Sequence, residues 1–242
     1  DDVPDSLRLT HLLFNNVGSH GYRGERLWVR RLKRLNEVAE RIGLPLIDVN
    51  SNLDNFRPAC LNYEQLNSPA NAAVAHVLAN GLKTWIFASS VEYSRVGVKS
   101  NAYNTAFVDS IALPLLSTTK LHLQVSASRF RRVDKTQLIS TIPDSWDALD
   151  VCLISDDSLE LNCSRCWKCL LTLGTLDLIH SLDKYSTRFD LAHWYAIRES
   201  YLAETRLFPL RPLERELSEF MHEHGYEVRP SLVPKALAAQ SK

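Results

Sequence analysis

Residues 151–169, with the sequence VCLISDDSLELNCSRCWKC, contain four of the five cysteines in this chain of 242 residues. The last three of the four are each separated by two residues, and the first lies ten residues ahead of them. Cysteines at this short spacing can bind one ion in a tight turn, and the sulfur from the preceding strand completes a tetrahedron. Because four thiolates leave no open coordination position, the spacing predicts a structural Zn²⁺ site formed by Cys152, Cys163, Cys166 and Cys169.

Three further interpretations of this cysteine cluster remain open. An iron–sulfur cluster is the sharpest of them, because C-x2-C-x2-C also occurs in ferredoxins. The ferredoxin pattern continues with x3-C-P, whereas Cys169 is followed by LLTL. A buried cluster of thiols and a set of disulfides are the two blander interpretations. The fifth cysteine, Cys60, is predicted to be a small residue of the core or of a loop.

Composition sets the class of protein around this cluster. The 28 basic residues balance the 28 acidic ones, which argues against non-specific binding of nucleic acid. The sequence has no apolar run of about twenty residues and no signal-peptide pattern, so no membrane partner is expected. The chain is therefore predicted to be cytoplasmic, where thiols stay reduced and clustered cysteines more often hold a metal than a disulfide.

Apolar periodicity predicts an α/β fold in the first part of the chain. Short apolar runs predict strands over residues 9–14, 45–50, 83–90 and 121–127. Helical patterns alternate with them over residues 25–42, from Ser68 to Gly81, and over 133–142. Alternation of this kind is typical of a Rossmann-like, mainly parallel sheet with helices on both faces.

Two domains are predicted on this basis. Residues 1–150 are expected to form the nucleotide-binding-type α/β domain, and residues 151–242 the zinc-binding loop with a helical C-terminal region. Within the second domain, a strand is expected over 150–155 and a loose tail after about residue 232. Helices are expected over 164–182, 190–205 and 213–224.

Ligands of such sheets bind beyond the carboxyl ends of the strands, which singles out the loop after Phe14. Asn15 and Asn16 are candidate nucleotide-facing residues, or simply residues favoured in turns. His20 and Arg23 follow in the same loop and can contact a phosphate or a substrate carboxylate, or else lie in solvent. These four residues are the predicted cofactor-binding set.

The sequence leaves the role of two further groups of polar residues undecided. The first is Arg131, Arg132 and Lys135, which open a predicted helix and can contact phosphate or form an ordinary solvated helix start. The second is His222 and His224, whose spacing resembles that of metal ligands. The sequence places no cysteine or carboxylate framework around the two histidines, so they are predicted to lie at a surface helix end.

The motif NCSRCWKC, placed after this sheet pattern, resembles the 7-cyano-7-deazaguanine synthases of the PP-loop ATP pyrophosphatase superfamily, whose fold is of the HUP type. It is most similar to divergent synthase-like proteins that carry NCGRC-x-KC, some of which belong to bacterial antiviral systems. The resemblance covers about residues 9–182 and includes three other stretches in the family order: THLLFNNVGSHGYRGER, WIFASSVEYS, and PLLSTTKLHLQ followed by RRVDKTQLI.

The resemblance implies an activity and a set of ligands. Enzymes of this family use ATP, with Mg²⁺, to adenylate the carboxylate of 7-carboxy-7-deazaguanine; ammonia then displaces AMP, and a second round gives the nitrile. Their zinc is structural and steadies the wall of the substrate pocket. The family pattern places Ser89, Ser90 and Tyr93 against the deazapurine substrate, while Asp109 falls where relatives often have histidine. A homodimer and a protein acceptor or defence-system partner are further expectations.

One departure from the family is serious. The family motif SGG-x-D-S, which cradles the pyrophosphate, does not occur in this sequence. The first readable strand matches the second strand of the family, so the first strand and the P-loop are expected to be missing from this chain. Two competing functions follow: a non-catalytic, zinc-stabilised binding or scaffold protein, and a PP-loop tRNA-modifying enzyme. The latter would need a catalytic cysteine pair beyond the four assigned to metal.

Overall fold

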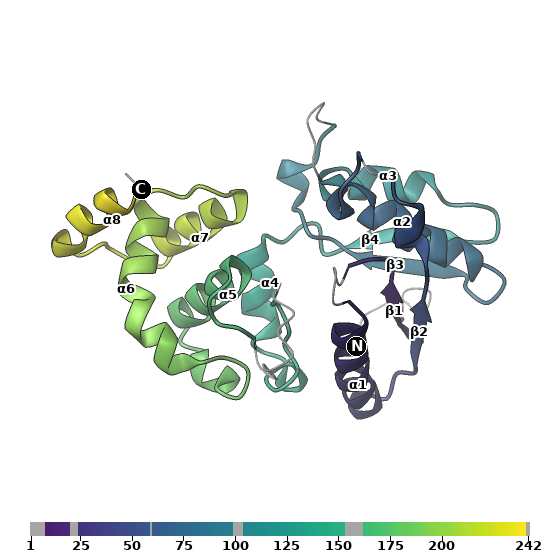
Figure 1. Cartoon of the computed structure of the whole chain (residues 1–242), viewed down its shortest axis with the longest axis horizontal. Helices are drawn as coiled ribbons and strands as arrows, with labels where there is room; N and C mark the ends of the chain where they lie inside the picture. The colour runs from purple at the N-terminus through teal and green to yellow at the C-terminus, as the bar shows by residue number, and fades with distance from the viewer. Residues whose placement is uncertain (1–7, 20–23, 59, 99–103, 153–161, 241–242) are drawn as a thin grey trace. The chain divides into compact units, whose positions relative to one another are not determined.

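Figure 1 shows a computed structural model of the chain, which describes residues 8–19, 24–58, 60–98, 104–152 and 162–240. The chain divides into two compact units, Asp1–Arg129 (unit 1) and Phe130–Lys242 (unit 2). The division lies ahead of residue 150 because the helix that follows Arg131 packs on the later helices of unit 2. His20 and Arg23 lie outside the described residues.

Unit 1 alternates strands and helices as the sequence predicts. Its strands are β1 (Leu12–Asn16), β2 (Leu46–Asn50), β3 (Thr84–Ala88) and β4 (His122–Ser126). Its helices are α1 (Gly24–Ile42), α2 (Tyr63–Val77) and α3 (Asp109–Leu115), with short 3-10 turns η3 (Leu53–Phe56), η4 (Tyr93–Arg95) and η5 (Thr105–Phe107). Each strand is shorter than the apolar run that predicted it.

The strands of unit 1 form two separate parallel pairs. β1 pairs with β2, with Leu12 opposite Leu46, and β3 pairs with β4, with Thr84 opposite His122. Within the described residues, neither pair is hydrogen-bonded to the other. The predicted α/β class and the parallel strand direction are therefore confirmed, whereas one continuous sheet is not formed.

Helix α2 begins earlier than the sequence predicts. Asn62 and Gln65 form a reciprocal capping box, in which the side chain of each accepts a hydrogen bond of 2.9 Å from the backbone N–H of the other. Ser68, the predicted N-cap, is instead buried inside the helix, and Pro69 lies in its second turn. The capping box satisfies two backbone donors at once, so it sets the start of the helix in place of Ser68 and Pro69.

Unit 2 is helical. It contains α4 (Arg132–Ile139), α5 (Trp167–Leu178), α6 (Leu191–Leu207), α7 (Pro212–Glu223) and α8 (Val233–Gln240), with 3-10 turns η6 (Pro143–Ser145), η7 (Leu182–Tyr185) and η8 (Pro230–Leu232). Its core is built on large buried side chains, including Tyr185, Phe189, Trp194, Leu217 and Phe220. At Gly174 of α5, an added Cβ would lie 3.1 Å from a methyl of Leu217 on α7, so a larger residue there would have to displace this side chain.

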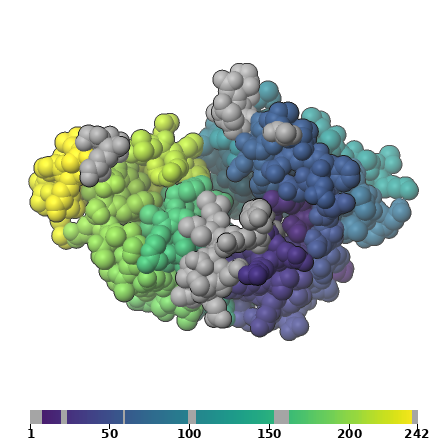
Figure 2. Space-filling model, viewed as in Figure 1, coloured from purple at the N-terminus to yellow at the C-terminus, as the bar shows by residue number. Residues whose placement is uncertain are grey.

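Two expectations for unit 2 are wrong. Residues 150–152 form no strand, and the rest of that predicted strand lies outside the described residues. The predicted loose tail is helix α8, which packs against α6. In Figure 2 the yellow residues of α8 accordingly lie on the green surface of unit 2. None of the helices in the described part of the chain has the length and apolar character needed to cross a bilayer.

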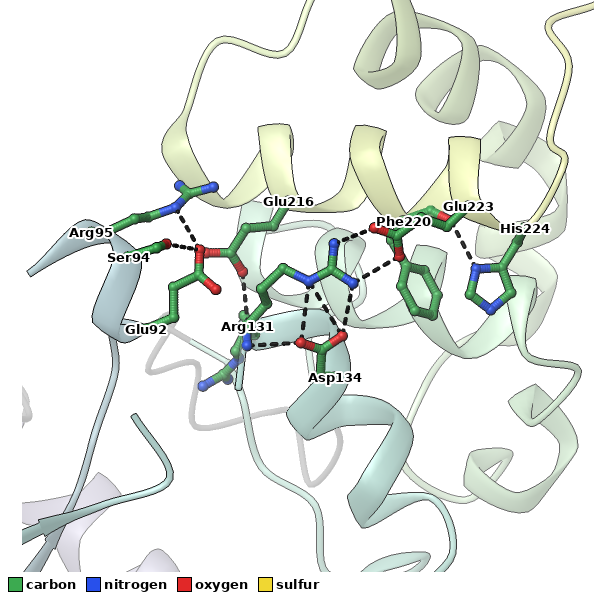
Figure 3. A network of polar contacts seen from close by, with 10 residues as sticks. Glu92, Ser94, Arg95, Arg131, Asp134, Glu216, Phe220, Glu223 and His224 are labelled. Carbon is green, nitrogen blue, oxygen red and sulfur yellow. Dashed lines mark hydrogen bonds and ion pairs between the residues drawn. The ribbon is translucent and has the colours of Figure 1, made fainter. Parts of the chain in front are cut away.

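A network of charged side chains ties the start of α4 to the end of α7 (Figure 3). The guanidinium of Arg131 donates to both carboxylate oxygens of Glu223, at 2.7 and 2.8 Å, and to Asp134 at 2.9 Å. Hydrogen bonds from Arg131 hold the pKa of Glu223 below its usual value. With its guanidinium engaged by two carboxylates, Arg131 does not serve as the free phosphate contact that the sequence left open.

Candidate metal centre

The four predicted zinc ligands come together in unit 2. Their sulfur atoms all lie within 4.8 Å of one another, with 3.8 Å between the sulfurs of Cys163 and Cys169 and 3.4 Å between those of Cys166 and Cys169. A tetrahedral zinc with Zn–S bonds of about 2.3 Å places its sulfurs about 3.8 Å apart. A disulfide would need about 2.05 Å, and all four cysteines are free thiols.

Backbone amides point at the sulfur atoms. The N–H of Cys163 donates to the sulfur of Cys152 at 3.4 Å. The N–H groups of Arg165 and Cys166 donate to the sulfur of Cys163 at 3.4 and 3.2 Å. Cys166 is the N-cap of α5, and Cys169 lies in the first turn of that helix. Amide donors and a helix N-terminus both favour negative charge, so the loop is arranged to hold thiolates rather than thiols.

Four adjacent thiolates also need a positive partner. Hydrogen bonding with Cys152 and Cys166, together with burial, raises the pKa of the Cys169 thiol. A divalent cation at the centre of the four sulfurs supplies the charge that lets all of them ionise. The guanidinium of Arg165 lies beside the loop, where it donates to the backbone carbonyl of Cys163 at 3.2 Å and pairs with Asp190 at 3.7 Å.

Ser164, between two of the ligands, is a residue that the sequence did not single out. It is fully buried and has a φ of 57°, in the left-handed region that favours glycine. The synthase-like motif NCGRC-x-KC has glycine at this place. Here the hydroxyl of Ser164 accepts a hydrogen bond of 2.9 Å from the backbone N–H of Asp190. This bond ties the metal loop to the start of α6 and offsets the conformational cost.

Asn162 is a second residue that the sequence did not single out. Its side-chain oxygen accepts from the N–H of Val151 at 2.9 Å, and its side-chain amide donates to the carbonyls of Leu149 at 3.0 Å and Arg188 at 3.2 Å. The residue is buried. The side chain of Asn162, which directly precedes Cys163, therefore holds the segment that leads to Cys152. It also holds the turn that leads to α6. The only sequence signal was its place directly before a ligand.

Replacing Asn162 by alanine is expected to destabilise unit 2 by about 2–3 kcal/mol, because it leaves buried backbone groups without partners. Metal affinity should fall as well, since the segment that carries Cys152 is no longer hydrogen-bonded to the segment that carries Cys163. Urea unfolding and competition with a chromophoric chelator measure the two effects. Gln137→Ala, at an exposed position of α4, is the control and should change stability by less than about 0.5 kcal/mol. Equal effects of the two substitutions would contradict this role.

The predicted cofactor-binding asparagines bond to other parts of unit 1. The side-chain amide of Asn15 donates to the side-chain oxygen of Asn71 on α2 at 3.0 Å. The side-chain amide of Asn16 donates to Asn50 at the end of β2 at 2.8 Å. These contacts place both residues at the carboxyl ends of the first strand pair, as the sequence predicts. Their role toward a nucleotide stays a prediction.

The predicted substrate-binding residues lie in the loop after β3. The hydroxyl of Ser89 is engaged in its own turn, where it bonds both the carbonyl and the N–H of Val91. Ser90 is exposed, and so is Tyr93, which presents 61% of its surface to solvent. The N–H of Tyr93 donates at 2.7 Å to the carbonyl of Ser128, just past β4. The loops after β3 and β4 are therefore joined, and Tyr93 is available to a ligand.

The metal centre fixes one part of the chemistry. A four-sulfur site has no open coordination position, so a zinc ion held there stabilises the fold and does not bind substrate. Among the described residues, this is the cluster of histidine, cysteine and carboxylate groups that can hold a metal, and His222 and His224 are not part of it. Comparisons with known protein families, with curated proteins and with solved structures found no match to this chain.

Proposed function

We propose that the protein is a zinc-stabilised, 7-cyano-7-deazaguanine synthase-like enzyme that uses ATP to adenylate and amidate a 7-carboxy-7-deazaguanine-type carboxylate. The observation that carries the proposal is the assembly of the NCSRCWKC cysteines into one four-sulfur centre. The centre follows a unit in which parallel strands alternate with helices, which is the order of elements in the family that the sequence resembles. The expected ligands are zinc, ATP with Mg²⁺, and a planar deazapurine.

The finer fold assignment belongs to the same proposal. Unit 1 corresponds to a Rossmann-like (HUP-type) nucleotide-binding domain, and its two parallel pairs to the two halves of such a sheet. Doubly wound sheets bind ligands beyond the carboxyl ends of their strands, at the point where the strand order reverses. In this chain that region would hold Asn15 and Asn16 at the carboxyl end of β1, and Ser90 and Tyr93 in the loop after β3.

Each group has a role in the proposed reaction. His20 and Arg23 would contact the phosphates of ATP, because arginine binds phosphate with two parallel hydrogen bonds. Tyr93 would stack on the deazapurine ring and orient its carboxylate toward the α-phosphate. Mg²⁺ would neutralise the phosphate charge during adenylation. A homodimer, a cytoplasmic location, and a protein acceptor or defence-system partner are parts of the same proposal.

One observation favours a second function. The sequence has no SGG-x-D-S motif, so its phosphate cradle is not evident. A non-catalytic protein that binds a deazapurine without ATP, or serves as a zinc-stabilised scaffold, fits that absence. The chain of residues 1–242 is accordingly expected to form no AMP from ATP and 7-carboxy-7-deazaguanine.

Substrate binding tests whether the chain recognises a deazapurine, as both the enzyme and the non-catalytic binder would and a pure scaffold would not. Calorimetric titration with 7-carboxy-7-deazaguanine should give saturable binding, and Tyr93→Ala should weaken it by about tenfold, because aromatic stacking on a base contributes about 1–3 kcal/mol. Folding should be unaffected, since Tyr93 is exposed. Tyr195→Ala, at a half-exposed tyrosine of α6, is the matched control and should bind normally. The absence of deazapurine binding, or equal loss in both variants, would contradict the proposed substrate.

A further inference from the structure

The last two cysteines of the metal loop form a C-x2-C pair at the start of helix α5. Cys166 is the N-cap of this helix and has extended backbone angles, with φ of −71° and ψ of 155°. Cys169 follows three residues later, in the first turn of the helix. Side chains three residues apart on a helix are neighbours on one face. The local backbone alone therefore brings these two thiols together.

The sulfur atoms of this pair lie close enough for a small movement to join them. They are 3.4 Å apart, whereas the sulfurs of Cys163 and Cys169 are 3.8 Å apart. A disulfide bond measures about 2.05 Å, so the sulfurs of Cys166 and Cys169 need to approach by about 1.4 Å. The sulfur of Cys163 is held in place by the backbone N–H groups of Arg165 and Cys166, at 3.4 and 3.2 Å. Bond formation is therefore easier between Cys166 and Cys169.

Solvent access differs between the two thiols of the pair. Cys169 is buried, whereas Cys166 is half-buried. A small oxidant in solution therefore reaches Cys166, and Cys169 is positioned to react with the oxidised neighbour. Cys152 is half-buried as well, but the next ligand in the sequence, Cys163, is eleven residues away on a separate segment. The helix thus supplies an exposed thiol and a buried partner thiol at Cys166 and Cys169 alone.

Positive charge accompanies the pair. Residues 162–176 contain two cations, Arg165 and Lys168, and no acidic side chain. The ammonium of Lys168 lies 5.6 Å from the ring of Trp167, one of the two residues that separate the cysteines. Thiolates bound to a metal are already ionised, and the thiolate is the form of cysteine that reacts with oxidants. Reactive cysteines are typically found in surroundings that are both electropositive and partly exposed.

We propose that Cys166 and Cys169 are a site of reversible oxidation, at which hydrogen peroxide forms a disulfide and releases the metal. The thiolate of Cys166 attacks one oxygen of the peroxide; an S–O bond forms, the O–O bond breaks, and hydroxide leaves. The thiolate of Cys169 then attacks the sulfur of the Cys166 sulfenic acid; an S–S bond forms, the S–O bond breaks, and a second hydroxide leaves. Two electrons pass from the two sulfurs to the peroxide, and the buffer protonates both hydroxides to water.

Oxidation at this pair would loosen unit 2 without dismantling the loop. Only Cys152 and Cys163 would remain as thiolate ligands, and two ligands do not form a closed zinc site. The stabilisation that the metal gives to the fold is then lost. The hydrogen bonds from Asn162 to the carbonyls of Leu149 and Arg188 involve no sulfur, so they keep the segments together until reduction restores the site. The inference holds whether or not the protein adenylates a deazapurine.

Peroxide treatment of the whole, zinc-loaded chain tests the site. The chain carries Cys60→Ser, so that the four cysteines of the loop are the remaining thiols. Peroxide should speed zinc release to a chromophoric chelator by at least about tenfold, because the metal loses two ligands. Mass spectrometry after alkylation should find one disulfide, Cys166–Cys169, with Cys152 and Cys163 alkylated. A dithiol with added zinc should restore the thiols and the bound metal. Zinc content is measured before treatment, so a failure of the metal prediction is seen separately.

Two histidine variants locate the reactive pair, because three cysteines and one histidine also form a closed zinc site. Cys166→His removes the exposed sulfur of the pair, so peroxide should not accelerate zinc release. Cys152→His keeps the pair and should release zinc within about twofold of the rate of the parent chain, since the same two thiolates react. If a histidine variant binds no zinc, the disulfide map of the parent chain still decides. A disulfide between any other two cysteines, zinc release without a disulfide, or equal acceleration in both histidine variants would overturn the proposal.

Discussion

Replacing Cys163 by serine is expected to unfold unit 2 and to leave unit 1 folded. Cys163 is one of the four predicted metal ligands, its sulfur accepts hydrogen bonds from two backbone amides, and the residue is 4% exposed. In small metal-bound units the free energy of binding, about 10–16 kcal/mol for structural zinc, is also free energy of folding. The free energy of unfolding of a typical domain is only about 5–15 kcal/mol, so losing the metal-binding energy is enough to unfold unit 2. Hydrogen exchange resolved by segment, together with thermal melting, measures the effect on each unit.

The fifth cysteine provides the control. Cys60 is exposed and belongs to unit 1, so Cys60→Ser should shift the free energy of unfolding by less than about 0.5 kcal/mol. A high-affinity zinc chelator should reproduce the Cys163 result on the original chain and should have little effect on unit 1. If Cys163→Ser and Cys60→Ser melt alike, the metal does not hold unit 2 together.

Replacing Glu216 by alanine is expected to cost unit 2 about 2–3 kcal/mol, because it leaves the backbone N–H of Arg132 without its buried acceptor and removes the negative charge near the Arg132 side chain. Glu216 lies on α7 and is 2% exposed. Its carboxylate accepts a hydrogen bond of 2.7 Å from the backbone N–H of Arg132, at the start of α4. Burial lowers the pKa of Arg132, and the charge of Glu216 opposes that shift. Urea unfolding measures the change.

Two variants make the Glu216 result specific. Glu219→Ala changes an exposed glutamate of the same helix and should alter stability by less than about 0.5 kcal/mol. Replacing Arg132 by methionine and Glu216 by leucine together should recover the part of the loss that comes from the uncompensated charge of Arg132, because an apolar pair leaves no buried charge. A double variant as unstable as Glu216→Ala would show that the cost comes from the lost hydrogen bond to the backbone N–H of Arg132 or from packing, and not from charge.

Local features of this chain are largely readable from its sequence. The grouping of the four cysteines was predicted from their spacing: one turn and the first turn of α5 bring Cys163, Cys166 and Cys169 together, and Cys152 joins them from the preceding segment. The spacing of apolar residues by three and four positions predicts helix α1, with a start one residue later than the observed one. The start of α2 was not predicted, because Ser68–Pro69 also has the pattern of a helix start, and the Asn62–Gln65 capping box six residues earlier was overlooked.

The remaining features depend on residues far apart in the chain. Arg131 has the local pattern of a phosphate-binding patch, but its partner Glu223 lies 92 residues away. Asn162 supports the metal loop through carbonyls at Leu149 and Arg188, which no local pattern reveals. The division of the sheet into two parallel pairs is likewise a matter of non-local pairing, and four apolar runs alone do not determine which strands become neighbours.

X-ray absorption at the zinc edge, with elemental analysis of protein purified without added metal, tests the central claim most directly. The account predicts one zinc per chain, surrounded by four sulfur atoms at about 2.3 Å and no oxygen or nitrogen ligand. Such a spectrum would establish the closed centre formed by Cys152, Cys163, Cys166 and Cys169. Iron with inorganic sulfide in place of zinc, or zinc with fewer than four sulfur ligands, would contradict it.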